Sequence, residues 1–445
     1  MKYFTIFPTM KRVWYRIIRF VKDRHVSYAF LIALLLSVFG YFSNNWVIFS
    51  SEELNLYTSI ESLRKIFESD DAEYSGALFV NTSMDNALIY VYDSSGGYVI
   101  GNTKITDRRK LLEFLKLLEG TDYAYLVIDI NFPQELTHKD SVGKQLDSEL
   151  VEQIKRMERC VVATHRDIVL MGNLEHKAAL ADYKSTVTAT NFTRYKYFEE
   201  IPSIPLHVYN EIRKSQGADT VACCFASSYL GFYWEGNKLC QNSLFLKFSS
   251  KGFPQLSKIR TEVGNLMNVE QYNYRNLGSD FIDHLDYGLP REEIQEDLKS
   301  YLKDAGNGKR PIVFIGNLQE DLHDTYAGLQ PGVIILYNAI KALFEGRHLV
   351  NPLRFICIFL VYFIISLFIL KDRELLYFIP DKFRRRYPFI HILLQFITIS
   401  TVLLIIDIID ISVFNVTSNF FLTIVFFGII KLYISFKKVK NEEAY

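Results

Sequence analysis

Cysteine is scarce in this sequence, and its spacing forms no metal motif. The five cysteines stand at positions 160, 223, 224, 240 and 357 of 445 residues, with no Cys-x-x-Cys pair among them. Cys223 and Cys224 are adjacent, so in a strand their side chains would point to opposite faces. We therefore expect no metal site and no cofactor. The sequence leaves open whether Cys223, Cys224 and Cys240 form a disulfide or stay as buried thiols.

The glycine-rich signatures of nucleotide-binding proteins are also missing. Neither G-x-x-x-x-G-K-[ST] nor G-x-G-x-x-G occurs, which removes the commonest phosphate cradles. The run His165-Arg166-Asp167 resembles part of a kinase catalytic loop, but Gly172 stands where that loop needs Asn. No Ser or Cys nucleophile is indicated by its spacing, so we do not expect an enzyme.

The charge of the chain is balanced overall but divided by region. Residues 50–350 hold 32 Lys and Arg against 42 Asp and Glu, whereas the rest of the chain holds 18 basic residues against 8 acidic ones. An acidic middle repels the phosphate backbone, so we expect no nucleic-acid partner.

Four apolar runs, each near the length of a membrane span of about 20 residues, frame the acidic middle. The basic clusters fall in the N-terminus at 1–26, in the loop at 371–388 and in the tail at 437–445, and basic segments stay in the cytoplasm. This pattern predicts a multi-pass protein of the inner, cytoplasmic membrane, with an anchor at 27–49, residues 50–350 outside, and three spans within 351–436. The runs after residue 350 are 353–370, 390–406 and 420–432.

Two alternatives to four spans stay open. The first run could be a cleaved signal peptide, although no small-x-small cleavage pattern follows it. One of the later runs could be a buried helix of a soluble fold, and the last run is the shortest. The membrane itself is the one partner that the sequence predicts directly.

The middle alternates strand and helix patterns. Apolar runs ended by turns predict buried strands, and apolar positions at helical spacing predict helices between them. The fold class that follows is α/β, with a mostly parallel central sheet flanked by helices, plus four transmembrane helices. We expect strands at 76–81, 123–132, 160–163 and 311–316, helices at 52–67, 106–118, 142–157, 292–305 and 333–346, and a hairpin joining 87–92 to 98–100.

Two stretches of the middle have a looser pattern. Residues 170–248 mix aromatic and polar residues with short strand-like runs at 186–190 and 244–248, which predicts an insertion packed over the sheet. Residues 317–330 form a polar loop between the last buried strand and the helix that begins after Pro331.

Three short motifs of this region follow one another in a recognisable order. The strand at 123–132 ends in Asp-x-x-Phe, with Asp129 and Phe132 at those positions. Tyr272-Asn273-Tyr274-Arg275 comes next, shortly before Gly278. Last comes an acidic loop with Asp324, followed by Pro331-Gly332-Val333 and a helix with Asn338.

These motifs resemble those of the CHASE type-2 domains, extracytoplasmic sensor modules of bacterial cyclases and kinases. The sequence departs from the family in three places: Leu336 replaces a frequent His, Asn276 replaces a usual Gly, and the Thr-Pro after the loop Asp is missing. The resemblance implies an extracytoplasmic sensor that binds a small-molecule or envelope ligand. The residues it points to for ligand binding are Asp129, Phe132, Arg275, Asp324 and Asn338.

The same resemblance shapes what we expect of partners. Relatives carry an output enzyme after their spans, but only nine residues follow Phe436, so we expect signalling to a separate protein and allow for a homo-oligomer. An envelope structural or assembly protein is the alternative, and an extracytoplasmic hydrolase built on Asp129, His323 and Asp324 is a third. Asp129 and Arg275 have opposite charges and could pair, and Asp129 and Asp324 could merely shape their turns.

Overall fold

The computed structural model describes residues 23–43, 76–92, 98–182, 194–197, 202–222, 232–241, 243–245, 274–325, 328–371, 386–409 and 426–429. The chain divides into two compact units. We call Leu54–Leu349 the α/β unit, and Met1–Glu53 together with Val350–Tyr445 the helical unit. The helix predicted at 52–67, the strand predicted at 186–190 and both Cys223 and Cys224 lie outside the described residues.

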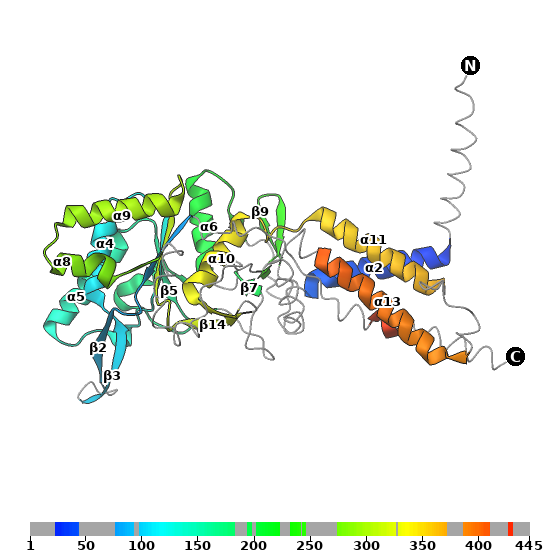
Figure 1. Cartoon of the computed structure of the whole chain (residues 1–445), viewed down its shortest axis with the longest axis horizontal. Coiled ribbons are helices and arrows are strands. Elements are labelled where there is room, and N and C mark those ends of the chain that lie inside the picture. The colour runs from blue at the N-terminus through cyan, green and yellow to red at the C-terminus, as the bar shows by residue number, and fades with distance from the viewer. Residues whose placement is uncertain are drawn as a thin grey trace, which may run out of the picture. The chain divides into compact units, whose positions relative to one another are not determined.

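A six-stranded parallel sheet forms the centre of the α/β unit (Figure 1). Its inner strands are short and apolar, which is typical of strands covered on both faces. The prediction that the runs at 123–132 and 311–316 share one sheet is confirmed, because they pair directly as β4 and β13. The strand order is β12 (Tyr274–Asn276), β1 (Ala77–Asn81), β13 (Ile312–Gly316), β4 (Tyr125–Asp129), β5 (Cys160–Thr164) and β6 (Ala178–Leu180).

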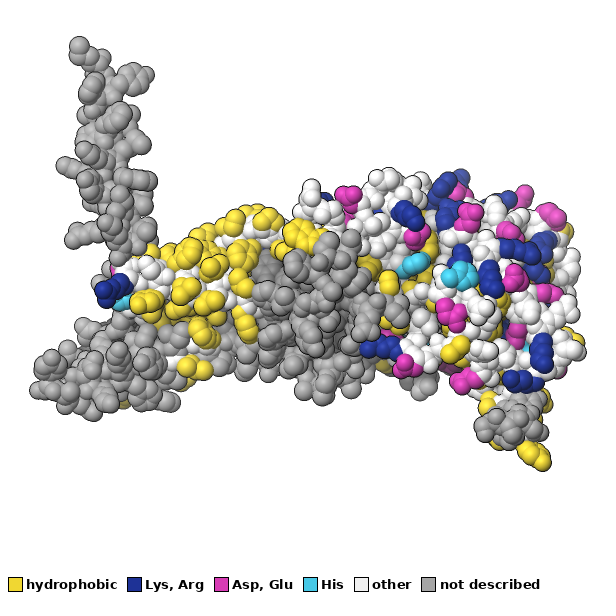
Figure 2. Space-filling model, turned by 180° about the vertical axis from the view of Figure 1, so that it is seen from behind, with side chains coloured by type: hydrophobic (Ala, Val, Ile, Leu, Met, Phe, Trp, Pro, Cys, Tyr) yellow, Lys and Arg dark blue, Asp and Glu magenta, His cyan; other side chains and the backbone are white. Residues whose placement is uncertain are grey.

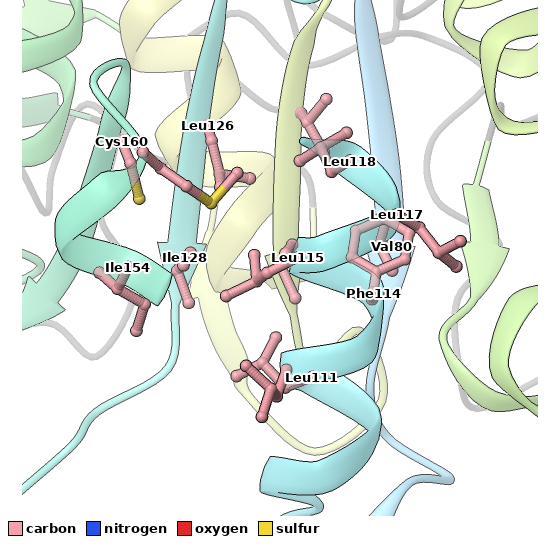
Figure 3. Close-up of a cluster of buried hydrophobic side chains, with 14 of the residues drawn as sticks. Val80, Leu111, Phe114, Leu115, Leu117, Leu118, Leu126, Ile128, Ile154 and Cys160 are labelled. Atoms are coloured by element: carbon pink, nitrogen blue, oxygen red, sulfur yellow. The ribbon is translucent and has the colours of Figure 1, made fainter. Parts of the chain in front are cut away.

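Three amphipathic helices cover one face of this sheet and enclose the main core. Asp107 caps the first of them by accepting hydrogen bonds from the backbone N–H groups of Arg109 and Lys110. Figure 3 shows side chains of this helix, such as Leu115, directed towards strand side chains such as Ile128. The helices are α4 (Arg108–Leu118), α5 (Ser141–Arg156) and α9 (Arg291–Gly306), close to their predicted bounds.

Two further helices lie on the opposite face of the sheet (Figure 1). They are α6 (Ile204–Ser215) and α10 (Gly332–Phe344). The ring of Tyr337 in α10 meets the rings of Phe79 and Phe314 edge-on, with centroids 5.6 and 5.9 Å apart. Helix α10 is buried along almost its whole length, so it belongs to the core of this unit.

Short antiparallel strands form small sheets separate from the central sheet. The predicted hairpin is confirmed as β2 (Asn86–Tyr92) paired with β3 (Val99–Thr106). The prediction of a polar loop at 317–330 is wrong in part, because β14 (Leu322–Thr325) and β15 (Gly328–Pro331) form a hairpin there. The remaining strands are β7 (Arg194–Lys196), β8 (Val221–Ala222), β9 (Phe232–Glu235), β10 (Lys238–Gln241) and β11 (Ser243–Phe245).

Short helical turns complete the α/β unit. Gly278 begins a π-type turn that leads directly into a short α-helix. The turns are η2 (Gln134–Leu136), η3 (Met171–Lys177), η5 (Gly278–Ile282) and α8 (Asp283–Asp286).

The helical unit contains α2 (Arg24–Ser43), α11 (Pro352–Leu370) and α13 (Pro388–Ile409). Helices α2 and α11 are antiparallel neighbours, since Asp23 before α2 lies 2.7 Å from the Nζ atom of Lys371 after α11. Farther along, the rings of Phe30 and Phe359 meet edge-on, with centroids 5.2 Å apart.

Four spans were predicted, and the described helices support one of them by length and composition alone. Within the described residues, Pro352–Leu370 is the helix long and apolar enough to cross a bilayer. The apolar parts of the other two helices, Arg24–Phe39 and Ile397–Ile406, are shorter than that limit. Of the run predicted at 420–432, only 426–429 is described, and it is helical.

Candidate functional site

Asp129 is the last residue of β4, at the carboxyl edge of the parallel sheet. Its register partner on the neighbouring strand is Gly316, the last residue of β13, so both central strands end at the same level. Open parallel sheets commonly bind ligands at this edge, because the loops that follow the strands diverge there. The structure therefore confirms the predicted place of Asp129 at a strand end.

The carboxyl group of Asp129 has one buried oxygen atom without a hydrogen-bond donor among the described residues, and its pKa is raised. Its Oδ2 atom is buried and accepts no hydrogen bond from the described residues, although the residue as a whole keeps some exposure. Burial, and then the charge of Asp321, raises the pKa of Asp129 to about 8. At neutral pH this carboxyl group is therefore mostly protonated and can donate a hydrogen bond as well as accept one. The Oδ1 atom of Asn131 is likewise buried without a partner among the described residues.

Gly316 allows the first turn of α10 to approach this strand end. A Cβ atom at position 316 would lie 2.5 Å from Cγ1 of Val333 and 3.3 Å from Cβ of Asp129. No described side chain caps the start of α10, and the helix begins beside Asp129 with its first backbone N–H groups. The edge thus combines a protonated carboxyl group with the positive end of a helix.

The loop after β13 borders the same edge. The backbone N–H of Gly332 donates to the backbone oxygen of Asp321, which ties the start of α10 to this loop. Nε2 of His323 lies 2.9 Å from Oδ1 of Asp321. The predicted meeting of this loop with the end of β4 is consistent with the effect of Asp321 on the pKa of Asp129.

The neighbouring strand end shows what a purely structural polar residue looks like. Asn81 ends β1, and its Oδ1 atom accepts hydrogen bonds from the backbone N–H groups of Ser83 and Leu318. Its Nδ2 atom donates to Oδ1 of Asn276 at 3.0 Å. Asn81 is therefore fully engaged in holding loops, whereas Asp129 is not.

Two residues predicted to bind ligand, Phe132 and Asn338, instead contact other parts of the protein. Phe132 is 1% exposed and belongs to the core under α4 and α5. The Nδ2 atom of Asn338 donates to the backbone oxygen of Ile334, one turn earlier in α10. The backbone of Asp324 lies in β14, but its side chain is outside the described part.

The predicted pairing of Asp129 with Arg275 is wrong. Arg275 lies in β12 at the border of the sheet, and β1 and β13 separate it from β4. Its guanidinium group instead lies over the ring of Tyr301, 4.2 Å from the ring centroid. Strand order decides this outcome, and strand order cannot be inferred from the motifs.

A second polar cluster lies away from the sheet edge. Glu235 ends β9, Cys240 lies in β10, and His348 follows α10. One ligand atom from each lies within 4.8 Å of the others, and all three residues are buried. Sequence analysis missed this group because its members are spread over 113 positions and match no spacing pattern.

Comparison with known proteins does not identify a function for either site. No protein family model, curated protein or solved structure matches the chain. The resemblance to CHASE type-2 domains therefore rests on the three short motifs alone, and the function is inferred from the geometry.

Proposed function

We propose that the chain is a multi-pass inner-membrane protein whose α/β unit is an extracytoplasmic, ligand-binding sensor domain. The observation that supports ligand binding is the Oδ2 atom of Asp129, which is buried at the carboxyl edge of a parallel sheet and accepts no hydrogen bond from the described residues. Burying a polar group without a hydrogen bond costs about 1–3 kcal/mol, a cost that a ligand can offset. The order of the CHASE type-2 motifs supports the same proposal.

The surfaces of the helical unit support membrane insertion. Large apolar side chains of α2 face outward, for example Leu31, which is 51% exposed, while Ala29, Ala33 and Ser37 are buried. This arrangement is the inverse of a soluble bundle and is typical of membrane helices, which pack through small residues. Figure 2 shows apolar side chains over the described surface of this unit, and charged side chains over the described surface of the α/β unit.

The ends of these helices support the proposed topology. Asp23 and Lys371 pair at one end of the antiparallel helices α2 and α11, next to the basic segments 1–26 and 371–388. The opposite ends, Ser43 and Pro352, are the ends that lead into residues 50–350. Basic segments stay in the cytoplasm, so residues 50–350 are outside.

The chemistry of the edge indicates the class of ligand. Asp129 in its neutral form donates a hydrogen bond, and on ionisation it attracts a cation, as does Asp321 beside it. A hydroxyl-rich or amine-bearing molecule satisfies both states. Ligand binding at the start of α10 would then be passed along that helix, and a separate protein would receive the signal.

One feature favours a second candidate, an envelope assembly protein. The β2–β3 hairpin exposes several apolar side chains, and it projects from the sheet (Figure 1). Exposed apolar patches of this kind often bind other proteins. The side chains are Leu88, Tyr90, Tyr98, Val99 and Ile100, which are 69, 65, 77, 53 and 68% exposed.

Reporter fusions test the membrane part of the proposal. A reporter that is active only outside the membrane should work when joined at Gly278 and fail when joined at Arg385. The reverse pattern would refute the topology.

Ligand binding is tested by thermal unfolding of the full chain in detergent, with a panel of sugars and polyamines as probes. At least one probe should raise the Tm of the wild type but not that of Asp129→Asn. Asp122→Asn is the matched control, because Asp122 lies before the opposite end of β4 and is 69% exposed. Equal shifts in all three proteins, or no shift with any probe, would contradict the site.

A further inference from the structure

The cluster of Glu235, Cys240 and His348 is built by backbone pairing between distant segments. Glu235 and Cys240 lie on the two strands of the β9–β10 hairpin. The backbone N–H of Gln241 donates to the backbone oxygen of His348 at 2.7 Å. The backbones of Cys240 and Leu349 are paired there in an isolated antiparallel β-bridge. The segment after α10 is therefore fixed against β10, which sets all three side chains together.

The three side chains are almost completely shielded from solvent. Glu235 is 4% exposed, and Cys240 and His348 are 0% exposed. A thiol, an imidazole and a carboxylate in one buried place are expensive to desolvate unless each has a partner. Nδ1 of His348 is buried and has no hydrogen-bond partner among the described residues.

The carboxylate of Glu235 is oriented from one side. The hydroxyl group of Tyr209 donates to Oε1 at 2.9 Å, and the guanidinium group of Arg213 lies 2.8 Å from the same oxygen. Nε2 of His348 lies 2.8 Å from the other oxygen, Oε2. One carboxylate oxygen is thus held by outer partners, while the other faces the histidine, as in carboxylates that bind a metal through one oxygen.

We propose that Glu235, Cys240 and His348 bind a zinc ion. A thiolate and an imidazole select a borderline transition metal over Ca²⁺ or Mg²⁺, and sulfur, nitrogen and oxygen donors together are typical of Zn²⁺. A tetrahedral zinc ion holds its ligand atoms roughly 3.5 Å apart, so atoms within 4.8 Å of one another need to move by about 1 Å. The fourth position is then open to water.

Binding exchanges protons for the metal ion. The thiol of Cys240 loses its proton to solvent on forming the Zn–S bond. The proton between Nε2 of His348 and Oε2 of Glu235 is released to solvent from an imidazolium ring, or moves to Nδ1 in a neutral ring, so that Nε2 is free to bind the ion. No oxidant or reductant is needed. The ion would fasten the segment that follows α10 to the β9–β10 hairpin. In the sequence, His348 comes four residues before Pro352, where α11 begins. This inference does not depend on the sensor proposal, because it uses none of the residues at the sheet edge.

Metal analysis of the full chain, purified in detergent without chelators, tests the proposal. We expect about one zinc per chain, and after exchange with Co²⁺ a sulfur-to-cobalt charge-transfer band in the near ultraviolet. Cys240→Ser should abolish that band, and His348→Gln should weaken Zn²⁺ binding on the order of a hundredfold, since even outer partners contribute 10- to 100-fold. Cys160→Ser is the matched control, because Cys160 is an equally buried free thiol in β5.

The outcome is decided by the wild type and the control together. A wild type and Cys160→Ser that both bind Co²⁺ with the charge-transfer band support the site, even if Cys240→Ser folds poorly. A wild type that binds no zinc and gives no charge-transfer band with Co²⁺ would show a hydrogen-bonded cluster only and overturn the proposal. A band that survives in a folded Cys240→Ser protein would overturn it as well.

Discussion

Two carboxylates in the α/β unit show how partners, rather than burial alone, determine the state of a buried acid. Burial, and then the charge of Asp321, raises the pKa of Asp129 to about 8. Burial also acts to raise the pKa of Glu235, but hydrogen bonds from His348 and Tyr209 outweigh it, and the pKa is lowered. Glu235 is thus ionised and held by partners, whereas the carboxyl group of Asp129 is mostly protonated and its buried Oδ2 atom accepts no hydrogen bond from the described residues.

The comparison separates a buried carboxylate that protein partners hold from one whose buried oxygen lacks a partner among the described residues. A folded protein usually satisfies its buried polar groups, as it does the carboxylate of Glu235 with an arginine, a tyrosine and a histidine. Asp129 costs stability as it stands, and such costs are typically retained where a ligand is bound.

The largest effect is expected when a carboxylate is placed in the core with no partner at all. Val127 is fully buried in β4, two residues before Asp129. Val127→Asp should cost about 5 kcal/mol or more and prevent folding. Protease resistance of membranes that express the variant measures this, with Val142→Asp, at a position 79% exposed, as control. Normal resistance would show that β4 is misassigned.

Removing the partnered carboxylate should be the next largest change. Glu235→Leu leaves the buried His348 without its acceptor and the partly exposed Arg213 without its carboxylate, at a cost of about 3 kcal/mol. The Tm of the full chain in detergent should fall by several degrees, while Glu211→Gln, at a half-exposed position on α6, should leave it unchanged. An unchanged Tm for Glu235→Leu would remove one side of the comparison.

A cation held by an aromatic ring should contribute less. Arg275 lies over Tyr301, so we expect a coupling of about 0.5–2 kcal/mol in a double-mutant cycle of Arg275→Met and Tyr301→Leu. Thermal unfolding of the four proteins gives the coupling. A coupling near zero would return Arg275 to the set of candidate ligand-binding residues.

The smallest effect on stability is expected at the exposed hairpin. Leu88→Glu combined with Tyr90→Glu should change stability by about 0.5 kcal/mol or less, because both side chains are already in solvent. Purification from native membranes shows whether the variant loses proteins that accompany the wild type. Loss of a partner with unchanged Tm would favour the assembly candidate over the sensor.

The sheet could largely be predicted from the sequence, because its strands are buried on both faces. The runs that became β4 and β13 are short, apolar and followed by polar loops, and such runs have few alternatives. Asp129 could be placed at a strand end for the same reason. The hairpin of β14 and β15 could not, since its residues are polar and the turn between them carries no strong turn signal.

The contacts between distant segments could not be predicted. Arg275 and Asp129 have suitable charges, but the place of β12 at the border of the sheet separates them. Glu235 and His348 meet because the segment after α10 pairs with β10, and no local pattern encodes that pairing. The order of the motifs and the residue types were therefore enough to predict that polar residues lie at one edge of the sheet. Which side chains lie next to one another there depends on the strand order, which the sequence did not reveal.

The pH dependence of the stability of Asp129→Asn shows whether the carboxyl group of Asp129 is protonated in the folded protein at neutral pH. An aspartate with a pKa near 3.9 in the unfolded chain and about 8 in the folded protein binds more protons when folded, so wild-type stability falls as pH rises between these values. Asparagine does not titrate. The Tm of Asp129→Asn minus that of the wild type should therefore grow from pH 5 to pH 8 and level off above, with a slope of roughly 1.4 kcal/mol of relative stability per pH unit below pH 8. A difference that does not change with pH, or a variant that becomes less stable than the wild type as pH rises, would show that Asp129 is ionised and partnered, and would contradict the account.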